Sequence, residues 1–261
     1  MSSESIRTRV EGGILEVIID RPKANAIDRA TSTTMGEVFA GFRDDPDIRV
    51  AILTGGGPKF FSAGWDLKAA AGGEDVDGDY GVGGFGGIQE LENFNKPVIC
   101  AVNGICCGGG FEIALCADII LAAENATFAL PEIRSGTIAD AASIKLPKRI
   151  PYHIAMEMLL TGRWLDANEA NRWGFVNEIV PADQLMNRSW EVARLIESGP
   201  PLVYAAIKEV VREAENMKFR DALRKITGSE FKTIETLYSS EDQLEGARAF
   251  AEKRDPIWQG K

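Results

Sequence analysis

Hydrophobic and polar positions along the first part of the chain predict strands separated by a helix. Residues 13–20 (GILEVIID) and 48–55 (IRVAILTG) are short apolar runs rich in β-branched residues, which is typical of buried strands. Between them, residues 35–45 (MGEVFAGFRDD) place apolar side chains at helical spacing and predict the end of an amphipathic helix. The first cycle is therefore strand, helix, strand.

A second cycle of the same kind follows. Residues 96–104 (KPVICAVNG) predict another buried strand, which leads into three glycines at 108–110 and a helix that begins FEIALCAD. Residues 118–130 (DIILAAENATFAL) then predict two further short strands. Such alternation predicts an α/β fold with right-handed crossovers, whose ligand sites lie in loops after strands and at helix N-termini.

Two regions depart from this alternation. From about Asp183 to Lys261, prolines separate segments of helical pattern, so we divide the chain into an α/β core, 1–199, and a helical region, 200–261. Residues 69–87 (AAAGGEDVDGDYGVGGFGG) are glycine-rich and acidic, which is typical of a flexible surface loop. A lid that covers a substrate is the alternative interpretation of this segment.

Composition and charge narrow the function classes. The 261 residues are 45% hydrophobic, enough for a sizeable core, and no apolar run is long enough to span a bilayer. Residues 1–13 do not resemble a signal or transit peptide, so we expect a cytoplasmic protein. A formal net charge of −10 opposes broad attraction to nucleic acid or anionic membranes, so neither is an expected partner.

Cysteine and histidine carry little of the expected chemistry. The four cysteines, Cys100, Cys106, Cys107 and Cys116, have no C-x-x-C spacing and are expected to fill the core rather than to bind metal. The only histidine, His153, lies before an apolar helical stretch, and the G-x-S-x-G motif of many hydrolases is missing. We therefore expect acid–base chemistry to come from carboxylates and predict no metal site.

Two glutamates lie where such chemistry is plausible. Glu112 falls in the first turn of the helix after the three glycines, where it either stabilises the helix dipole or acts as an acid or base beside unpaired backbone N–H groups. Glu132 follows Pro131 at the end of a predicted strand, twenty residues further along the chain. Their spacing alone does not determine whether these two carboxylates meet.

Four segments carry a family resemblance. FSAGWDL (61–67), KPVICAVNGICCGGGFEIALCAD (96–118), FALPE (128–132) and RWGFVNEIVP (172–181) resemble, in order and approximate spacing, the crotonase or enoyl-CoA hydratase/isomerase superfamily. The likeness extends from about Ile14 to Ile257. It implies an α/β crotonase-like (ClpP/crotonase) spiral of repeated ββα units, followed by a C-terminal helical region for trimerisation and coenzyme A (CoA) contact.

Further segments point to one branch of this superfamily. RPKANAID (21–28), FFSAGWDLKAAAGGE (60–74), GGGFEIAL (108–115) and AFAEKRDPIWQGK (249–261) are similar to the branch whose acyl group bears a trimethylammonium. This similarity implies a hydro-lyase that reversibly removes water from an acyl-CoA through an oxyanion-stabilised enolate. The alternatives are a generic short-chain enoyl-CoA hydratase, an isomerase that uses one glutamate, and a non-catalytic acyl-CoA-binding homologue.

The resemblance assigns roles to particular residues. The backbone N–H groups of Trp65 and Gly109 are expected to form an oxyanion hole for the thioester carbonyl. Glu112 is expected to activate water for attack on the β-carbon, and Glu132 to exchange the proton at the α-carbon. Retention of both glutamates favours hydration and dehydration over isomerisation.

The resemblance also implies a CoA site and an assembly. Residues that would contact CoA lie in the N-terminal motif, the oxyanion loop and the C-terminal motif: Ala24, Ala63, Asp66, Leu67, Phe250 and Lys253. The last two would reach CoA from the same or an adjacent subunit. No cofactor beyond the substrate thioester is implied, and the expected assembly is a trimer or a dimer of trimers.

The segment after Glu132 departs from the family pattern. Ala139 stands where the family usually has proline, Ala142 and Ser143 stand near its glycine pair, and the segment is one residue shorter. We therefore expect a reshaped loop and leave open whether hydration activity is retained.

Three residues are candidates for selecting the acyl group. A trimethylammonium donates no hydrogen bonds, so aromatic faces and carboxylates are the groups that recognise it. Tyr80 and Phe85 in the glycine-rich segment, and Asp140 after Glu132, supply such groups. For Asp140, the alternative is a role as a loop residue or helix cap.

Overall fold

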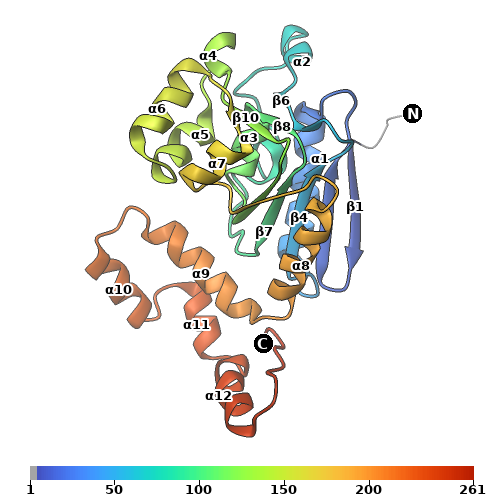
Figure 1. Cartoon of the computed structure of the whole chain (residues 1–261). Coiled ribbons are helices and arrows are strands. Elements are labelled where there is room, and N and C mark those ends of the chain that lie inside the picture. The colour runs from blue at the N-terminus through green and yellow to red at the C-terminus, as the bar shows by residue number, and fades with distance from the viewer. Residues whose placement is uncertain (1–4) are drawn as a thin grey trace.

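The largest sheet of the protein has six strands in the computed structural model, which describes residues 5–261 (Figure 1). Its strand order is β1-β2-β4-β7-β9-β12, with β1 antiparallel to β2 and the other neighbours parallel. The strands are β1 (Ile6–Glu11), β2 (Ile14–Ile19), β4 (Val50–Gly55), β7 (Val98–Val102), β9 (Ile119–Ala123) and β12 (Glu178–Val180).

A four-stranded sheet, in the order β11-β10-β8-β5, is built from short strands that follow those of the larger sheet. These strands are β5 (Phe60–Ser62), β8 (Ile105–Cys107), β10 (Thr127–Ala129) and β11 (Leu165–Asp166), while β3 (Ala26–Ile27) pairs with β6 (Gly64–Trp65). Thus β7 is followed by β8 and α3 (Gly109–Ala114), and β9 by β10 and α4 (Glu132–Ser135). This repetition of ββα units confirms the predicted crotonase-like spiral.

Helices cover both faces of the larger sheet. Helix α1 (Arg29–Asp44), capped by the Asp28 carboxylate, buries Met35, Phe39 and Phe42 in the main core. Helix α8 (Leu185–Glu197) packs on the other face, in a second apolar cluster. The remaining helices of the core are α2 (Leu67–Ala71), η1 (Phe85–Gly87), α5 (Asp140–Lys145), η2 (Leu146–Lys148), α6 (Tyr152–Thr161) and α7 (Ala167–Trp173).

The predicted elements are largely confirmed, with one correction. The strands expected at 13–20, 48–55, 96–104 and 118–130 are present, and His153 lies in the first turn of α6. Segment 69–87, however, is only in part the expected surface loop: residues 71–79 are mostly exposed, whereas the part from Tyr80 to Gly87 packs on the core. Tyr80 is 6% exposed, and a Cβ at Gly87 would lie 2.4 Å from the Gly36 nitrogen of α1. The glycines that suggested flexibility instead allow close packing on α1.

The cysteines are free thiols and fill space in the core, as expected. Cys100, Cys106 and Cys107 are buried and Cys116 is half-buried. Burial raises the pKa of Cys107 and of Cys116 to about 11, so both are neutral thiols near pH 7.

The C-terminal part of the chain is helical, as predicted, and extends away from the sheets (Figure 1). It contains α9 (Pro201–Ala214), α10 (Phe219–Thr227), α11 (Lys232–Tyr238) and α12 (Asp242–Glu252). Lys208 attaches α9 to the core, because its Nζ donates to the Lys96 carbonyl and to Asp118 Oδ2, each at 2.7 Å. The division at residues 199 and 200 stays a prediction. Among residues 5–261, no helix is long and apolar enough to cross a membrane.

Candidate active site

A small pocket of about 60 Å³ lies where β6, α3, α4, α5 and segment 69–87 meet. Its walls contain both predicted glutamates, both predicted oxyanion residues and the three predicted selectivity residues. The full lining is Trp65, Val76, Tyr80, Phe85, Gln89, Gly109, Glu112, Glu132, Thr137, Ile138 and Asp140. The fold therefore brings together residues that are up to 75 positions apart in the sequence.

Two backbone amides, those of Trp65 and Gly109, are available at this pocket. The amides on either side of Trp65 are used internally, since Gly64 donates to Ser62 Oγ and Asp66 donates to the Ile27 carbonyl. Successive amides of an extended chain point to opposite sides, so the Trp65 N–H points away from β3. Gly109 begins α3, so its N–H has no acceptor within the helix.

Close backbone contact holds these two amides near each other. A Cβ at Gly64 would lie only 2.5 Å from the Gly109 nitrogen, so no larger residue fits there without displacement. Gly64 also has φ +79°, in the left-handed region that favours glycine. The strand that carries Trp65 and the helix start that carries Gly109 consequently touch through their main chains.

Glu112 is a buried carboxyl on α3. Its side chain is 7% exposed, and Oε1 accepts a hydrogen bond from the Ala142 N–H at 3.0 Å. Burial raises the pKa of Glu112 to about 7, the Ala142 hydrogen bond opposes this rise, and the negative charges of Glu132 and Asp140 add to it. Glu112 is therefore poised to gain or lose a proton near neutral pH.

Glu132 lies at the start of α4, close to the glycine turn before α3. A Cβ at Gly108 would lie 3.0 Å from Glu132 Oε1, and Oε2 is buried without a hydrogen-bond partner among residues 5–261. Burial raises the pKa of Glu132, and the charge of Asp140 raises it further. A carboxylate oxygen that is buried and unpaired is available to a proton of a bound molecule.

Aromatic rings form another wall of the pocket. Tyr80 and Phe85 pack edge to face with ring centroids 5.5 Å apart. The Tyr80 hydroxyl donates to the Asp75 carbonyl at 2.9 Å, and Trp65 Nε1 donates to Glu74 Oε1 at 3.2 Å. The polar groups of these side chains are thus bonded within segment 69–87, which leaves their rings to contact a ligand.

The segment after Glu132 adopts a helical form that supports Glu112. Residues 140–145 form α5, in which Ala142 is buried and donates its N–H to the Glu112 carboxylate. Asp140 is the first residue of α5, whereas the N-cap position is Ala139, so the interpretation of Asp140 as the cap is wrong. Ala142 is fully buried where α5 packs on α3, so this position suits a small side chain.

The predicted CoA residues fall into two separate groups. Ala63 N–H donates to the Ala24 carbonyl at 3.0 Å, next to Asp66, which pairs with Arg21 at 2.7 Å, and to the exposed Leu67. This first group continues directly from the Trp65 edge of the pocket.

Phe250 and Lys253 form the second group, which the single chain does not bring to the pocket. Phe250 is 87% exposed on α12, and Lys253 directly follows that helix. Helix α12 lies at the opposite end of the molecule from β6, α3 and α4 (Figure 1).

Four lining residues were missed by sequence reasoning: Val76, Gln89, Thr137 and Ile138. None lies in a recognisable motif. Gln89 is notable because its Nε2 atom is buried and has no hydrogen-bond partner among the described residues. Gln89 follows segment 69–87 and lines the same pocket as Glu112, and no local sequence pattern predicts this placement.

The fold and this site belong to a known class. Residues 9–261 match the profile of the Enoyl-CoA hydratase/isomerase family. The chain belongs to this family, also called the crotonase family.

Individual relatives are similar over almost their full lengths. Carnitinyl-CoA dehydratases of Citrobacter koseri and Salmonella agona are each 53% identical over 260 residues, which cover 99% of this chain and 100% of theirs. The crystal structure of an enoyl-CoA hydratase from Mycobacterium tuberculosis has a TM-score of 0.90 and 36% identity, and the match covers 99% of this chain and 100% of that one. An enoyl-CoA hydratase from Bacillus anthracis has a TM-score of 0.89 and 31% identity, covering 98% and 100%.

Substitutions at two neighbouring positions test the amide pair. A Cβ at Gly109 would lie 2.3 Å from the Phe85 ring, so we expect Gly109→Val to lose at least a hundredfold in kcat/KM for hydration of crotonyl-CoA. Cys107→Ala removes only a buried thiol and should lose less than fivefold. Thermal unfolding of both variants serves as the folding control. Equal activity of two folded variants would contradict the assignment of Gly109.

Proposed function

We propose that this protein is a hydro-lyase that interconverts carnitinyl-CoA with crotonobetainyl-CoA and water. The observation that carries the proposal is the pair of buried carboxyls, Glu112 and Glu132, which share one pocket with the amides of Trp65 and Gly109. The full-length similarity to carnitinyl-CoA dehydratases supports this choice of acyl group.

The two amides stabilise the charge that develops during the reaction. The thioester carbonyl oxygen accepts from the N–H groups of Trp65 and Gly109, and its negative charge grows as the enolate forms. Two oriented donors, one of them at the start of α3, bind that charge more strongly than the neutral carbonyl, which lowers the barrier. A single donor of this kind contributes about 3 to 4 kcal/mol.

The two glutamates exchange two protons with the substrate. In dehydration, the Glu132 carboxylate removes the α-proton, and the electrons of that C–H bond form the enolate. The enolate then re-forms the thioester as the β-carbon–oxygen bond breaks, and protonated Glu112 gives its proton to the departing hydroxyl, which leaves as water. Hydration follows the same steps in reverse. Every proton is moved by a carboxyl of the chain, so the scheme uses no additional cofactor.

The environments of the two carboxyls support these opposite roles. Glu112 has a pKa of about 7 and is therefore the group that carries a proton at the start of dehydration. The pKa of Glu132 is also raised, by burial and by Asp140. Two nearby carboxyls that repel each other titrate as a pair, and a pair that holds one proton serves both directions.

The walls of the pocket suit a cationic acyl group. Trp65, Tyr80 and Phe85 supply aromatic rings, and Asp140 and the glutamates supply negative charge. A quaternary ammonium is attracted to aromatic faces and carboxylates, while an uncharged acyl chain gains nothing from the carboxylates. A generic short-chain enoyl-CoA hydratase is the second candidate, and the solved structures of that name support it. Both glutamates being present disfavours a one-glutamate isomerase and a non-catalytic homologue.

The assembly and location are also part of the proposal. We propose that CoA lies along Ala24, Ala63, Asp66 and Leu67, and that Phe250 and Lys253 reach it from a neighbouring subunit of a trimer or dimer of trimers in the cytoplasm. The 87% exposure of Phe250 and the 78% exposure of Phe219 on the C-terminal helices support contact with another copy.

Replacing either glutamate tests the cooperation of the pair. Glu112→Gln and Glu132→Gln should each lower kcat at least a hundredfold, because one proton transfer is lost, and the double variant should be little worse than either single one. Binding of a substrate thioester should change less than threefold. Near wild-type turnover of folded Glu132→Gln would refute its role at the α-carbon.

The pH dependence tests the shared proton. Water addition consumes no net proton, so kcat/KM for hydration and for dehydration must have the same pH profile. The active form holds one proton on the pair, so we expect a bell whose alkaline side falls as pH rises through about 7, where Glu112 loses its proton. Initial rates of both reactions between pH 4 and 10 measure this profile. A rate that keeps rising above pH 8 would contradict the proposal.

Matched substrates test the acyl group. We expect carnitinyl-CoA to exceed 3-hydroxybutyryl-CoA by at least tenfold in kcat/KM, because only the former has the cation. Tyr80→Ala combined with Phe85→Ala should reduce this ratio about tenfold, since a desolvated aromatic ring contributes up to about 2 kcal/mol to cation binding. The ratio within one variant is insensitive to general loss of activity. A wild-type preference for the uncharged substrate would instead identify a generic hydratase.

A further inference from the structure

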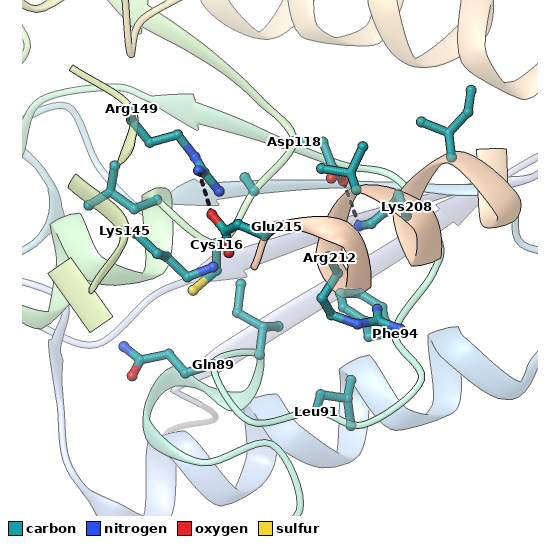
Figure 2. A pocket seen from close by; sticks show the side chains of 15 residues that line it. Gln89, Leu91, Phe94, Cys116, Asp118, Lys145, Arg149, Lys208, Arg212 and Glu215 are labelled. Carbon is teal, nitrogen blue, oxygen red and sulfur yellow. Dashed lines mark hydrogen bonds and ion pairs between the residues drawn. The ribbon is translucent and has the colours of Figure 1, made fainter. Parts of the chain in front are cut away.

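A second, larger cavity lies between helix α9 and the core. It encloses about 280 Å³ and is walled by α9, by α5 and η2, by residues 115–118 after α3, and by residues 88–94 (Figure 2). Gln89 is the only residue that lines both this cavity and the candidate active site. This volume is slightly below that of typical pockets for drug-sized ligands, so it suits a smaller molecule of several non-hydrogen atoms.

Positive charge predominates in this cavity. Its lining contains four basic side chains and two carboxylates, a local excess of two positive charges in a chain of net charge −10: Lys145, Arg149, Lys208, Arg212, Asp118 and Glu215. The cavity therefore reverses the sign of the charge that the whole chain carries. An anion is favoured here and disfavoured over most of the remaining surface.

The basic groups are only partly neutralised by the protein. Lys208 lies 2.7 Å from Asp118, and Arg149 lies 3.6 Å from Glu215. Figure 2 draws these two ion pairs as dashed lines, and no dashed line reaches Lys145. Among the described residues, Arg212 bonds to Asn95 and Glu213, neither of which lines the cavity.

Two unfavourable features of the cavity remain, the repulsion between its cations and one buried donor. Burial lowers the pKa of Lys208, Asp118 opposes this, and the like charges of Arg212 and Lys145 lower it further, so these cations repel one another. Gln89 Nε2 is a buried donor without an acceptor among residues 5–261, and an unsatisfied buried donor destabilises the folded protein. An acceptor with negative charge would satisfy both.

The rest of the lining is apolar, which limits the kind of anion. Six hydrophobic side chains contribute to the walls: Ile88, Leu91, Phe94, Leu115, Ile207 and Val211. We propose that this cavity is a second ligand site that binds a short aliphatic carboxylate, with its charge at Lys145, Arg149 and Gln89 and its chain along the apolar wall. Inorganic phosphate offers no apolar surface for that wall, and a neutral ligand leaves the cations unpaired. This site does not depend on the dehydration proposed above.

Calorimetric titration of the full-length protein tests this site with hexanoate and three comparison ligands. Hexanoate should bind with a dissociation constant in the millimolar range or tighter. Hexanamide has the same shape without charge, acetate has the charge without the chain, and inorganic phosphate has charge without apolar surface. Each should bind at least tenfold more weakly than hexanoate.

Variants locate the bound hexanoate. Lys145→Met and Arg149→Met should each weaken its binding at least fivefold, while Arg172→Met, which removes an exposed charge from α7, should leave binding unchanged. Thermal unfolding identifies any variant that fails to fold. If one of the two cavity variants does not fold, the other still tests the site. The proposal is overturned if hexanoate does not bind, if hexanamide binds equally well, or if both cavity variants bind hexanoate like the wild type.

Discussion

The main-chain contact between Gly64 and the start of α3 is the constraint on which the rest of the site depends. A side chain at Gly64 would occupy the space of the Gly109 nitrogen, so the strand and the helix start can approach only through glycine. That contact places two free amides at one pocket. It also fixes the first turn of α3, and hence the direction of Glu112, relative to the strand that carries Trp65. The amides of Trp65 and Gly109 and the Glu112 carboxyl are therefore positioned by one main-chain contact.

Burial of two acids is the second feature that shapes this molecule. Desolvation of a carboxylate is unfavourable, yet the fold buries Glu112 almost completely and compensates this burial with a hydrogen bond from the Ala142 N–H. The result is a carboxyl that exchanges its proton near neutrality rather than one that is permanently charged. The altered segment after Glu132 contributes to this balance, because α5 supplies that donor through its first turn. The segment that departs from the family pattern after Glu132 thus supplies a hydrogen bond to the site.

The same helices serve two cavities of opposite charge. Glu112 and Cys116 lie one turn apart along α3 and its end, yet Glu112 faces the acidic and aromatic pocket while Cys116 lines the basic cavity under α9. Likewise, α5 presents Asp140 to the first and Lys145 to the second. Gln89 lies between the two cavities and lines both. A chain of strongly negative net charge can thus offer a cationic group and an anionic group distinct environments within one fold.

The sequence by itself determined the alternation of strands and helices, the helical C-terminal region and the two glutamates as candidates, because strand and helix periodicities and the glycine turn are local properties. The ββα spiral was implied by the family resemblance, which rests on motifs spread along the chain. The meeting of Glu112 with Glu132 was not local, since it depends on how β8 and β10 lie side by side in the second sheet. Segment 69–87 shows the limit most clearly. Its glycines indicated flexibility, but in the fold Gly87 packs closely against α1, and Tyr80 and Phe85 of the same segment line the pocket. The basic cavity was not predictable from the sequence, because its cations come from α5, from the residue after η2 and from α9, and only the tertiary structure brings these elements together. Composition gives only the net charge of the chain, whereas the binding of an anion depends on where the charged side chains lie.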